Sequence, residues 1–68
     1  MSTIDISANG TQMAIEADFA QAASPIVYIE DGERYSTPFQ VADARHEDSR
    51  AIEMVREWLE SSPTLSRA

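Results

Sequence analysis

The chain contains only two glycines, and each stands in a dipeptide that favours a two-residue β-hairpin turn. Asn9-Gly10 and Asp31-Gly32 suit the type I′ turn, because both central residues of that turn need a positive φ angle. The residues on either side alternate between apolar and polar side chains, which is the period of a half-buried strand. We therefore predict two hairpins. Their four strands cover residues 2–7, 11–17, 26–29 and 34–41.

Two segments leave alternatives open. Pro38 has no N–H to donate to a strand partner, so the fourth strand lies at a sheet edge near this residue or carries a bulge. Residues 18–24 are rich in alanine, and Asp18 could cap a helical turn that Ser24-Pro25 would end. A loop with one turn of helix fits this segment as well as an extension of the second strand.

The C-terminal third predicts one amphipathic helix. Its apolar face repeats at helical spacing, and the residues that form this face are Ala51, Ile52, Val55, Trp58 and Leu59. Asp48 or Ser49 is the expected N-cap, and Ser61-Ser62-Pro63 should end the helix.

The predicted fold class is α+β: a four-stranded antiparallel sheet of two hairpins, with the C-terminal helix packed on one face. The sheet residues expected beneath the helix are Ile4, Ile6, Met13, Ile15 and either Val27 or Tyr28. Residues 1–62 should form a single domain, followed by a flexible tail over 63–68. A core this small rarely supplies more than about 3–5 kcal/mol, so a homodimer is a further alternative.

The charge balance restricts the partners. Twelve carboxylates oppose five basic side chains, all arginine, for a net charge of −7. Phosphate contacts need basic residues, so this balance argues against direct binding of nucleic acid, and an anionic membrane surface would repel the chain. A basic partner is the electrostatic complement, although net charge also simply favours solubility. The first five residues lack the basic and apolar regions of a signal peptide, which predicts a cytoplasmic location.

No motif indicates catalysis or a cofactor. Cysteine is absent, and His46 is the only histidine. His46 with Asp43 or Asp48 could form a base and its orienting group, but no nucleophile elbow or glycine-rich loop accompanies them. Asp43, Glu47 and Asp48 lack the ligand order of a calcium loop. We expect His46 and Asp43 to join the fourth strand to the helix by hydrogen bonds, and we predict no enzyme activity, no metal and no cofactor.

Acidic residues gather in two places, which we predict as the partner-binding residues. Spacings of four and three place Glu53, Glu57 and Glu60 on one helix face. The second group, Glu30, Asp31 and Glu33, surrounds the second hairpin turn. Carboxylates about 5–6 Å apart along the helix could occupy a basic groove meant for nucleic acid. An ordinary solvated helix face would show the same pattern. Glu53 with Arg56, and Glu47 with Arg50, are expected ion pairs.

As a whole, the chain resembles the small, acidic, phage-encoded inhibitor proteins, anti-CRISPR proteins among them. The shared features are the short length, the absence of cysteine, the negative charge, the sheet-plus-helix pattern and the two acidic groups. The resemblance implies a protein that docks on a basic, nucleic-acid-binding host complex in the host cytoplasm. There it would block nucleic-acid binding or assembly, in some cases by imitating DNA.

An alternative from the same residues is a small interaction or assembly module that uses an apolar patch or an edge strand. The anchors of the patch would be Tyr28, Tyr35, Phe39 and Trp58. The strand that bears Pro38 would offer the edge for an added strand.

Overall fold

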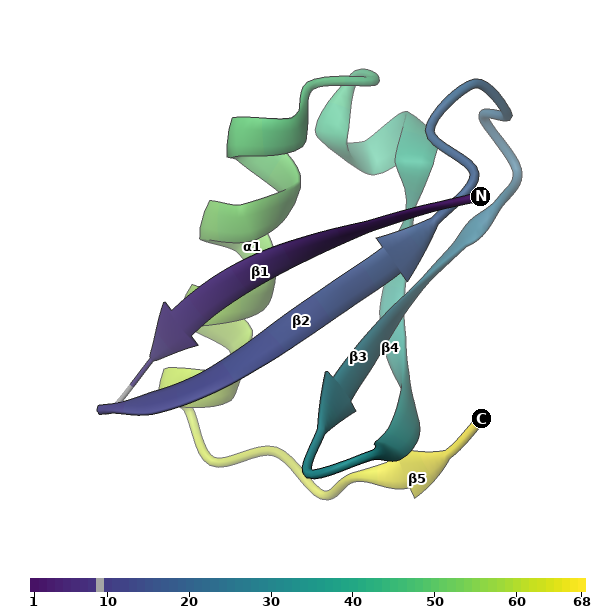
Figure 1. Cartoon of the computed structure of the whole chain (residues 1–68). Helices are drawn as coiled ribbons and strands as arrows, with labels where there is room; N and C mark the ends of the chain where they lie inside the picture. The colour runs from purple at the N-terminus through teal and green to yellow at the C-terminus, as the bar shows by residue number, and fades with distance from the viewer. Residues whose placement is uncertain (9) are drawn as a thin grey trace.

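The computed structural model describes residues 1–8 and 10–68 and confirms the α+β class, with one antiparallel sheet and one α-helix. The strands follow one another across the sheet in chain order. The elements are β1 (Ser2–Ala8), β2 (Thr11–Ala17), β3 (Pro25–Glu30), β4 (Glu33–Gln40), the 3₁₀ helix η1 (Val41–Ala44), α1 (Asp48–Glu60) and β5 (Ser66–Arg67). Figure 1 shows α1 and η1 on the same side of the sheet, so the molecule has two layers and one open sheet face.

The first predicted hairpin is confirmed. β1 and β2 pair in one unbroken register, from Ser2 opposite Ala17 to Ala8 opposite Thr11. This register leaves two residues for the turn, and Gly10 has the positive φ (74°) that the sequence predicts there. Asn9, the other predicted turn residue, lies outside the described residues.

The second hairpin confirms its predicted turn completely. Glu30 pairs with Glu33, so Asp31 and Gly32 form the whole connection. Their φ angles are 54° and 79°. Two positive φ angles in a two-residue loop are the mark of the type I′ turn, whose twist matches that of the flanking strands.

The bulge that Pro38 predicts is present in β4. Val27 pairs with Ser36, whereas Pro25 pairs with Gln40. Between these two pairs β4 therefore contains two more residues than β3. A residue that cannot donate to a ladder is accommodated where the ladder is interrupted. The strand ends at Gln40, one residue before the predicted end.

The sheet has five strands, so the predicted count of four is wrong. Within the tail predicted to be flexible, Ser66 pairs with Ser36 and Arg67 pairs with Tyr35. The outer side of β4 offers backbone groups before Pro38, and the chain after α1 passes around the tip of the β3–β4 hairpin to reach them (Figure 1). A two-residue strand is too short to show the alternation of apolar and polar residues by which a strand is predicted. The mobility of residues 63–68 stays a prediction.

The core lies between the helix layer and the sheet. Ala51 and Val55 of α1 are fully buried. Tyr28, rather than Val27, faces the helix, since Tyr28 pairs with buried Ile15 and neighbouring residues of a strand point to opposite faces. The fully or almost fully buried residues are Ile6, Met13, Ile15, Ala17, Ile26, Tyr28, Val41, Ala44, Ala51 and Val55.

Residues 18–24 form a loop with two hydrogen-bonded turns and are neither a helix nor a strand extension. Gln21 N–H donates to Asp18 O (2.9 Å), and Ser24 N–H donates to Gln21 O (3.1 Å). The Asp18 side chain accepts from Ala20 N–H (3.2 Å), which stabilises the first turn of this loop instead of capping a helical turn. Val41 N–H donates to Ser24 O (3.0 Å), and this bond ties the loop to η1.

The predicted N-cap of the helix is wrong. Glu47 is the cap residue, without a side-chain hydrogen bond, and Asp48 is already in the first turn. A carboxylate in the first turn is favoured by the helix dipole, so Asp48 still stabilises this end. α1 has 13 residues. Over residues 1–8 and 10–68, no helix has the length and apolar character needed to cross a membrane.

Candidate interaction surface

The sequence predicts that three carboxylates at the second hairpin turn bind a partner, and two of them already have a side-chain partner within the chain. Glu33 forms an ion pair with Arg67 of β5, in which Oε2 and Nη1 are 2.6 Å apart. Glu30 is half-buried, and its Oε1 accepts a hydrogen bond of 2.5 Å from the Tyr28 hydroxyl. Asp31 is exposed at the tip of the turn. Arg67 therefore partly neutralises the charge of Glu33, and the Tyr28 hydroxyl fixes the position of the Glu30 carboxylate.

Tyr28 links this turn to the core. Its side chain is 2% exposed, and its ring stacks on that of Tyr35 with a centroid separation of 5.6 Å. Burial, followed by the hydrogen bond to Glu30 and the charge of Glu30, raises the pKa of Tyr28 well above its ordinary value. The hydroxyl therefore stays neutral and keeps donating to Glu30 at every physiological pH.

The outer face of α1 carries the other three predicted residues. Glu53, Glu57 and Glu60 are all exposed, on the side of the helix opposite buried Ala51 and Val55. We call these three glutamates the α1 acidic face. In the described residues none of the three takes part in an ion pair. Their like charges at spacings of three and four cost a few tenths of a kcal/mol.

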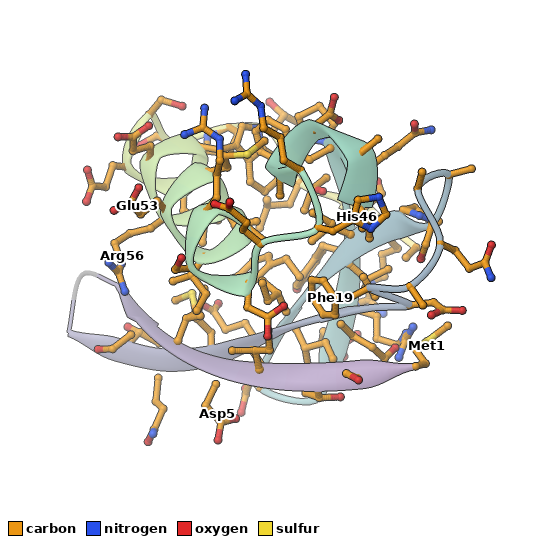
Figure 2. The ribbon with its side chains drawn as sticks, turned by 90° about the horizontal axis from the view of Figure 1, so that it is seen from above. Met1, Asp5, Phe19, His46, Glu53 and Arg56 are labelled. Atoms are coloured by element: carbon orange, nitrogen blue, oxygen red, sulfur yellow. The ribbon has the colours of Figure 1, made fainter. Side chains whose placement is uncertain are left out.

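The arginines of α1 do not neutralise this face as the sequence predicts. The expected pairs of Glu53 with Arg56 and of Glu47 with Arg50 are absent from the part of the chain that the structure describes. Instead, Arg56 Nε donates to the main-chain oxygen of Ser7 in β1 (3.2 Å). Figure 2 shows Arg56 reaching from the helix toward the sheet, while Glu53 points outward. Tertiary packing thus withdraws one positive charge from the helix surface.

The two predicted acidic groups meet only in part. The β3–β4 turn and the C-terminal end of α1 lie at the same end of the molecule (Figure 1), and Glu30 and Leu59 line one cleft there. Glu60 follows Leu59 directly. Glu53 lies seven residues earlier, or about 10 Å along the helix axis. The structure therefore places Glu30 near the last turn of α1, while Glu53 lies away from the β3–β4 turn.

This cleft is the feature that sequence reasoning missed. Its volume is about 240 Å³. It lies between the ends of both hairpins and the segment where α1 stops. The lining residues are Thr11, Met13, Tyr28, Glu30, Leu59, Ser62, Pro63 and Leu65. A sequence signal for it is Leu65, the one large apolar residue of the tail, which is 37% exposed.

Asp43 serves the connection that follows β4, as expected, whereas His46 contacts the loop between β2 and β3 and not the fourth strand. The Asp43 carboxylate accepts from Gln40 N–H (2.7 Å), which closes the first turn of η1. His46 Nδ1 lies 3.0 Å from Phe19 O (Figure 2), and this nitrogen carries the proton, because a carbonyl can only accept. Over the described ranges, no group of three histidine or acidic side chains is placed to hold a metal ion.

β1 forms one edge of the sheet, and β4 stays open on its outer side around Pro38, because β5 pairs only with Tyr35 and Ser36 in the described residues. Across the residues that the structure describes, β1 pairs only with β2, whereas β4 pairs with both β3 and β5. Ser7 O, which accepts from Arg56, points away from β2. The outward direction recurs every second residue along a strand, so the main-chain groups of Asp5 and Thr3 face the same edge. Figure 2 shows the Asp5 side chain pointing away from α1.

The chain matches no protein family model, no curated protein sequence and no solved structure. Its function must therefore be inferred from its own residues.

Proposed function

We propose that this chain is a non-catalytic binding protein whose α1 acidic face docks on a basic, nucleic-acid-binding host protein complex. By occupying that basic surface it would block nucleic-acid binding or assembly, as an inhibitor of the anti-CRISPR type. The supporting observation is the state of Glu53, Glu57 and Glu60, which are exposed and without ion pairs in the described residues.

The positions of the arginines also support docking through the α1 acidic face. Arg34 and Arg67 pair with Glu16 and Glu33 on the sheet, and Arg56 is turned toward β1. The outer face of α1 then carries three glutamates and one exposed arginine, Arg50, which leaves an excess of negative charge on that face. Complementary charge of this kind speeds docking and selects basic partners.

The test compares two variants that remove the same charge from different places. The first replaces Glu53, Glu57 and Glu60 by glutamine. The second, matched variant changes Asp5→Asn, Asp43→Asn and Glu47→Gln, which are exposed positions away from this face. Each removes three negative charges, which takes the net charge from −7 to −4.

The readout is capture of partners from a host lysate, followed by displacement of DNA or RNA from the captured complex. We expect the wild type to retain a nucleic-acid-binding complex that high salt releases, since exposed charges are screened over about 8–10 Å at physiological ionic strength. The glutamine variant should lose this complex, and the matched variant should keep it. Equal binding by the two variants would refute the docking role of the α1 acidic face.

The free β1 edge favours a second candidate, an interaction module that binds by strand addition. A partner strand would pair with the outward main-chain groups of Thr3, Asp5 and Ser7 and displace Arg56 from Ser7. Asp5→Pro removes the outward N–H at the centre of that edge. This candidate predicts binding that survives high salt and is lost in Asp5→Pro. Retained binding in that variant would exclude it.

A further inference from the structure

We propose that the cleft at the end of α1 is a receptor for one arginine side chain of the basic partner, with the Glu30 carboxylate as its anchor. The inference rests on the proposed function in so far as the partner is basic. It adds a specific point of recognition to the diffuse charge of the α1 acidic face.

The walls of the cleft suit an aliphatic stem. Met13, Leu59, Pro63 and Leu65 supply apolar surface from a strand, the last turn of the helix and the segment that follows it. Arginine packs its methylene groups along such surface while its charged end reaches a polar partner. Leu65 is 37% exposed without a ligand, and an inserted stem would cover it.

The polar end of the cleft suits a cation. Glu30 is half-buried beside these apolar walls, yet the two ion pairs formed by the described residues use Glu33 and Glu16 instead. Its Oε1 accepts from Tyr28, and Oε2 accepts no hydrogen bond among the described residues. A carboxylate without a counter-ion in a partly apolar site gains from a cationic ligand, because the low local polarity strengthens the attraction.

The geometry favours arginine over a compact ammonium group. The Tyr28 hydroxyl donates its hydrogen to Glu30, so its oxygen still offers a lone pair. Glu30 Oε2 and Tyr28 Oη are then two neighbouring acceptors, which the planar fork of a guanidinium can address together.

The test uses the intact protein and the peptide acetyl-Gly-Gly-Arg-Gly-Gly-amide, followed by two-dimensional amide NMR. We expect a dissociation constant of about 1–10 mM for so small a ligand. The shifted amides should be those of Met13, Glu30, Leu59 and Leu65. A matched peptide with citrulline, which has the same shape without the charge, should bind at least about tenfold more weakly.

Two single substitutions separate the cleft from general electrostatics. Glu30→Gln keeps an acceptor for Tyr28 and should weaken the arginine peptide about tenfold. Glu57→Gln makes the same charge change on the α1 acidic face and should change affinity less than twofold. Leu65→Ser, which shortens an exposed wall of the cleft, should weaken binding about two- to threefold without disturbing the core.

The proposal is overturned if arginine and citrulline peptides bind equally, if Glu30→Gln and Glu57→Gln have equal effects, or if the shifts map to α1 alone. Equal binding of a lysine peptide would overturn the choice of arginine. The peptide assay needs no host complex. The two proposals can therefore fail separately. If the cleft proposal fails alone, the peptide does not bind but capture of the host complex still depends on charge. If the proposed function fails alone, the peptide binds but changes in the α1 acidic face do not affect capture.

Discussion

The first hairpin, β1–β2, keeps one register through seven residue pairs, whereas the second, β3–β4, shifts its register between Pro25 and Val27. The side chains show the opposite trend. The second hairpin has a stacked tyrosine pair, the Tyr28–Glu30 hydrogen bond and an ion pair to β5. Among the described residues of the first hairpin, the side-chain hydrogen bond is an exposed contact of 3.4 Å between Thr3 and Glu16.

The difference shows how a small sheet tolerates an interruption of its ladder. Where Pro38 cannot donate, the Thr37 hydroxyl donates to Ile26 O (2.6 Å) and accepts from Phe39 N–H (3.3 Å). Side chains thus replace backbone bonds, and a buried carbonyl stays satisfied. We expect the regular hairpin to be insensitive to polar substitutions and the interrupted hairpin to depend on them.

The largest effect should come from Tyr28→Ala, which removes the buried ring of the second hairpin. Loss of a large aromatic side chain from a core costs about 3–5 kcal/mol, comparable to the whole stability of such a domain. The variant should be mostly unfolded at 25 °C by far-UV circular dichroism. Val27→Ala, the next position on the strand and on the open face, should stay folded. If both variants remained folded, Tyr28 would not be the centre of the core.

Tyr28→Phe should cost about 1.5–3 kcal/mol at pH 7, because it removes a hydrogen bond to a charged group. In the wild type the pKa of Tyr28 is raised in the folded state, so unfolding releases its proton once the pH exceeds the unfolded value of about 10. The stability that Tyr28 contributes is complete below that pH and is lost above it, by about 1.4 kcal/mol per pH unit. Urea unfolding at pH 9 and pH 11 should show this loss in the wild type and a smaller one in Tyr28→Phe. Parallel pH dependence would contradict the buried, neutral hydroxyl.

Thr37→Val tests the replacement of ladder bonds at the bulge. The change preserves shape but leaves Ile26 O and Phe39 N–H without the hydroxyl, at a cost of about 1–2 kcal/mol. Thr3→Val is the matched change on the first hairpin, and its effect should stay within about 0.5 kcal/mol. Equal urea midpoints for the two variants would mean that the hydroxyl of Thr37 is not needed at the bulge.

The ion pairs should give the smallest effects. Glu33→Gln removes a pair whose side chains are 44% and 73% exposed, so the free energy of unfolding should fall by less than about 0.5 kcal/mol. Glu16→Gln should cost more, about 1 kcal/mol, because Glu16 is only 19% exposed and its Oε1 lies 2.5 Å from Arg34 Nη1. Thermal unfolding of both variants at low and high salt measures the difference. A larger loss in Glu33→Gln would reverse the expected order.

Local rules predicted much of the fold because they depend on neighbouring residues. The turn at Asp31-Gly32 follows from the φ angles that a two-residue hairpin needs, and the bulge follows from the missing N–H of Pro38. The N-cap of α1 was predicted wrongly, since Glu47 occupies it without a side-chain bond. The cap position depends on where η1 and the turn after it place the start of α1, and sequence spacing does not specify that place.

The candidate site was predictable only in its charges. Helical spacing places Glu53, Glu57 and Glu60 together, and they are exposed as expected. Which arginines would neutralise them was not predictable, because Arg56 finds Ser7 O in β1, 49 residues earlier in the chain. Such contacts depend on how the layers pack, and many partners compete for a long side chain.

The sequence by itself determined the two hairpins, the helix and the excess of negative charge, because turn sterics, side-chain periodicity and composition act over a few residues. Only the tertiary structure decided that the tail adds β5 to the sheet, that Tyr28 instead of Val27 faces the helix, and that Glu30 stands in a cleft with Leu59 and Leu65. The physical reason is that these contacts join segments far apart in the chain. Their positions follow from packing two layers around one core, and no local pattern specifies that packing.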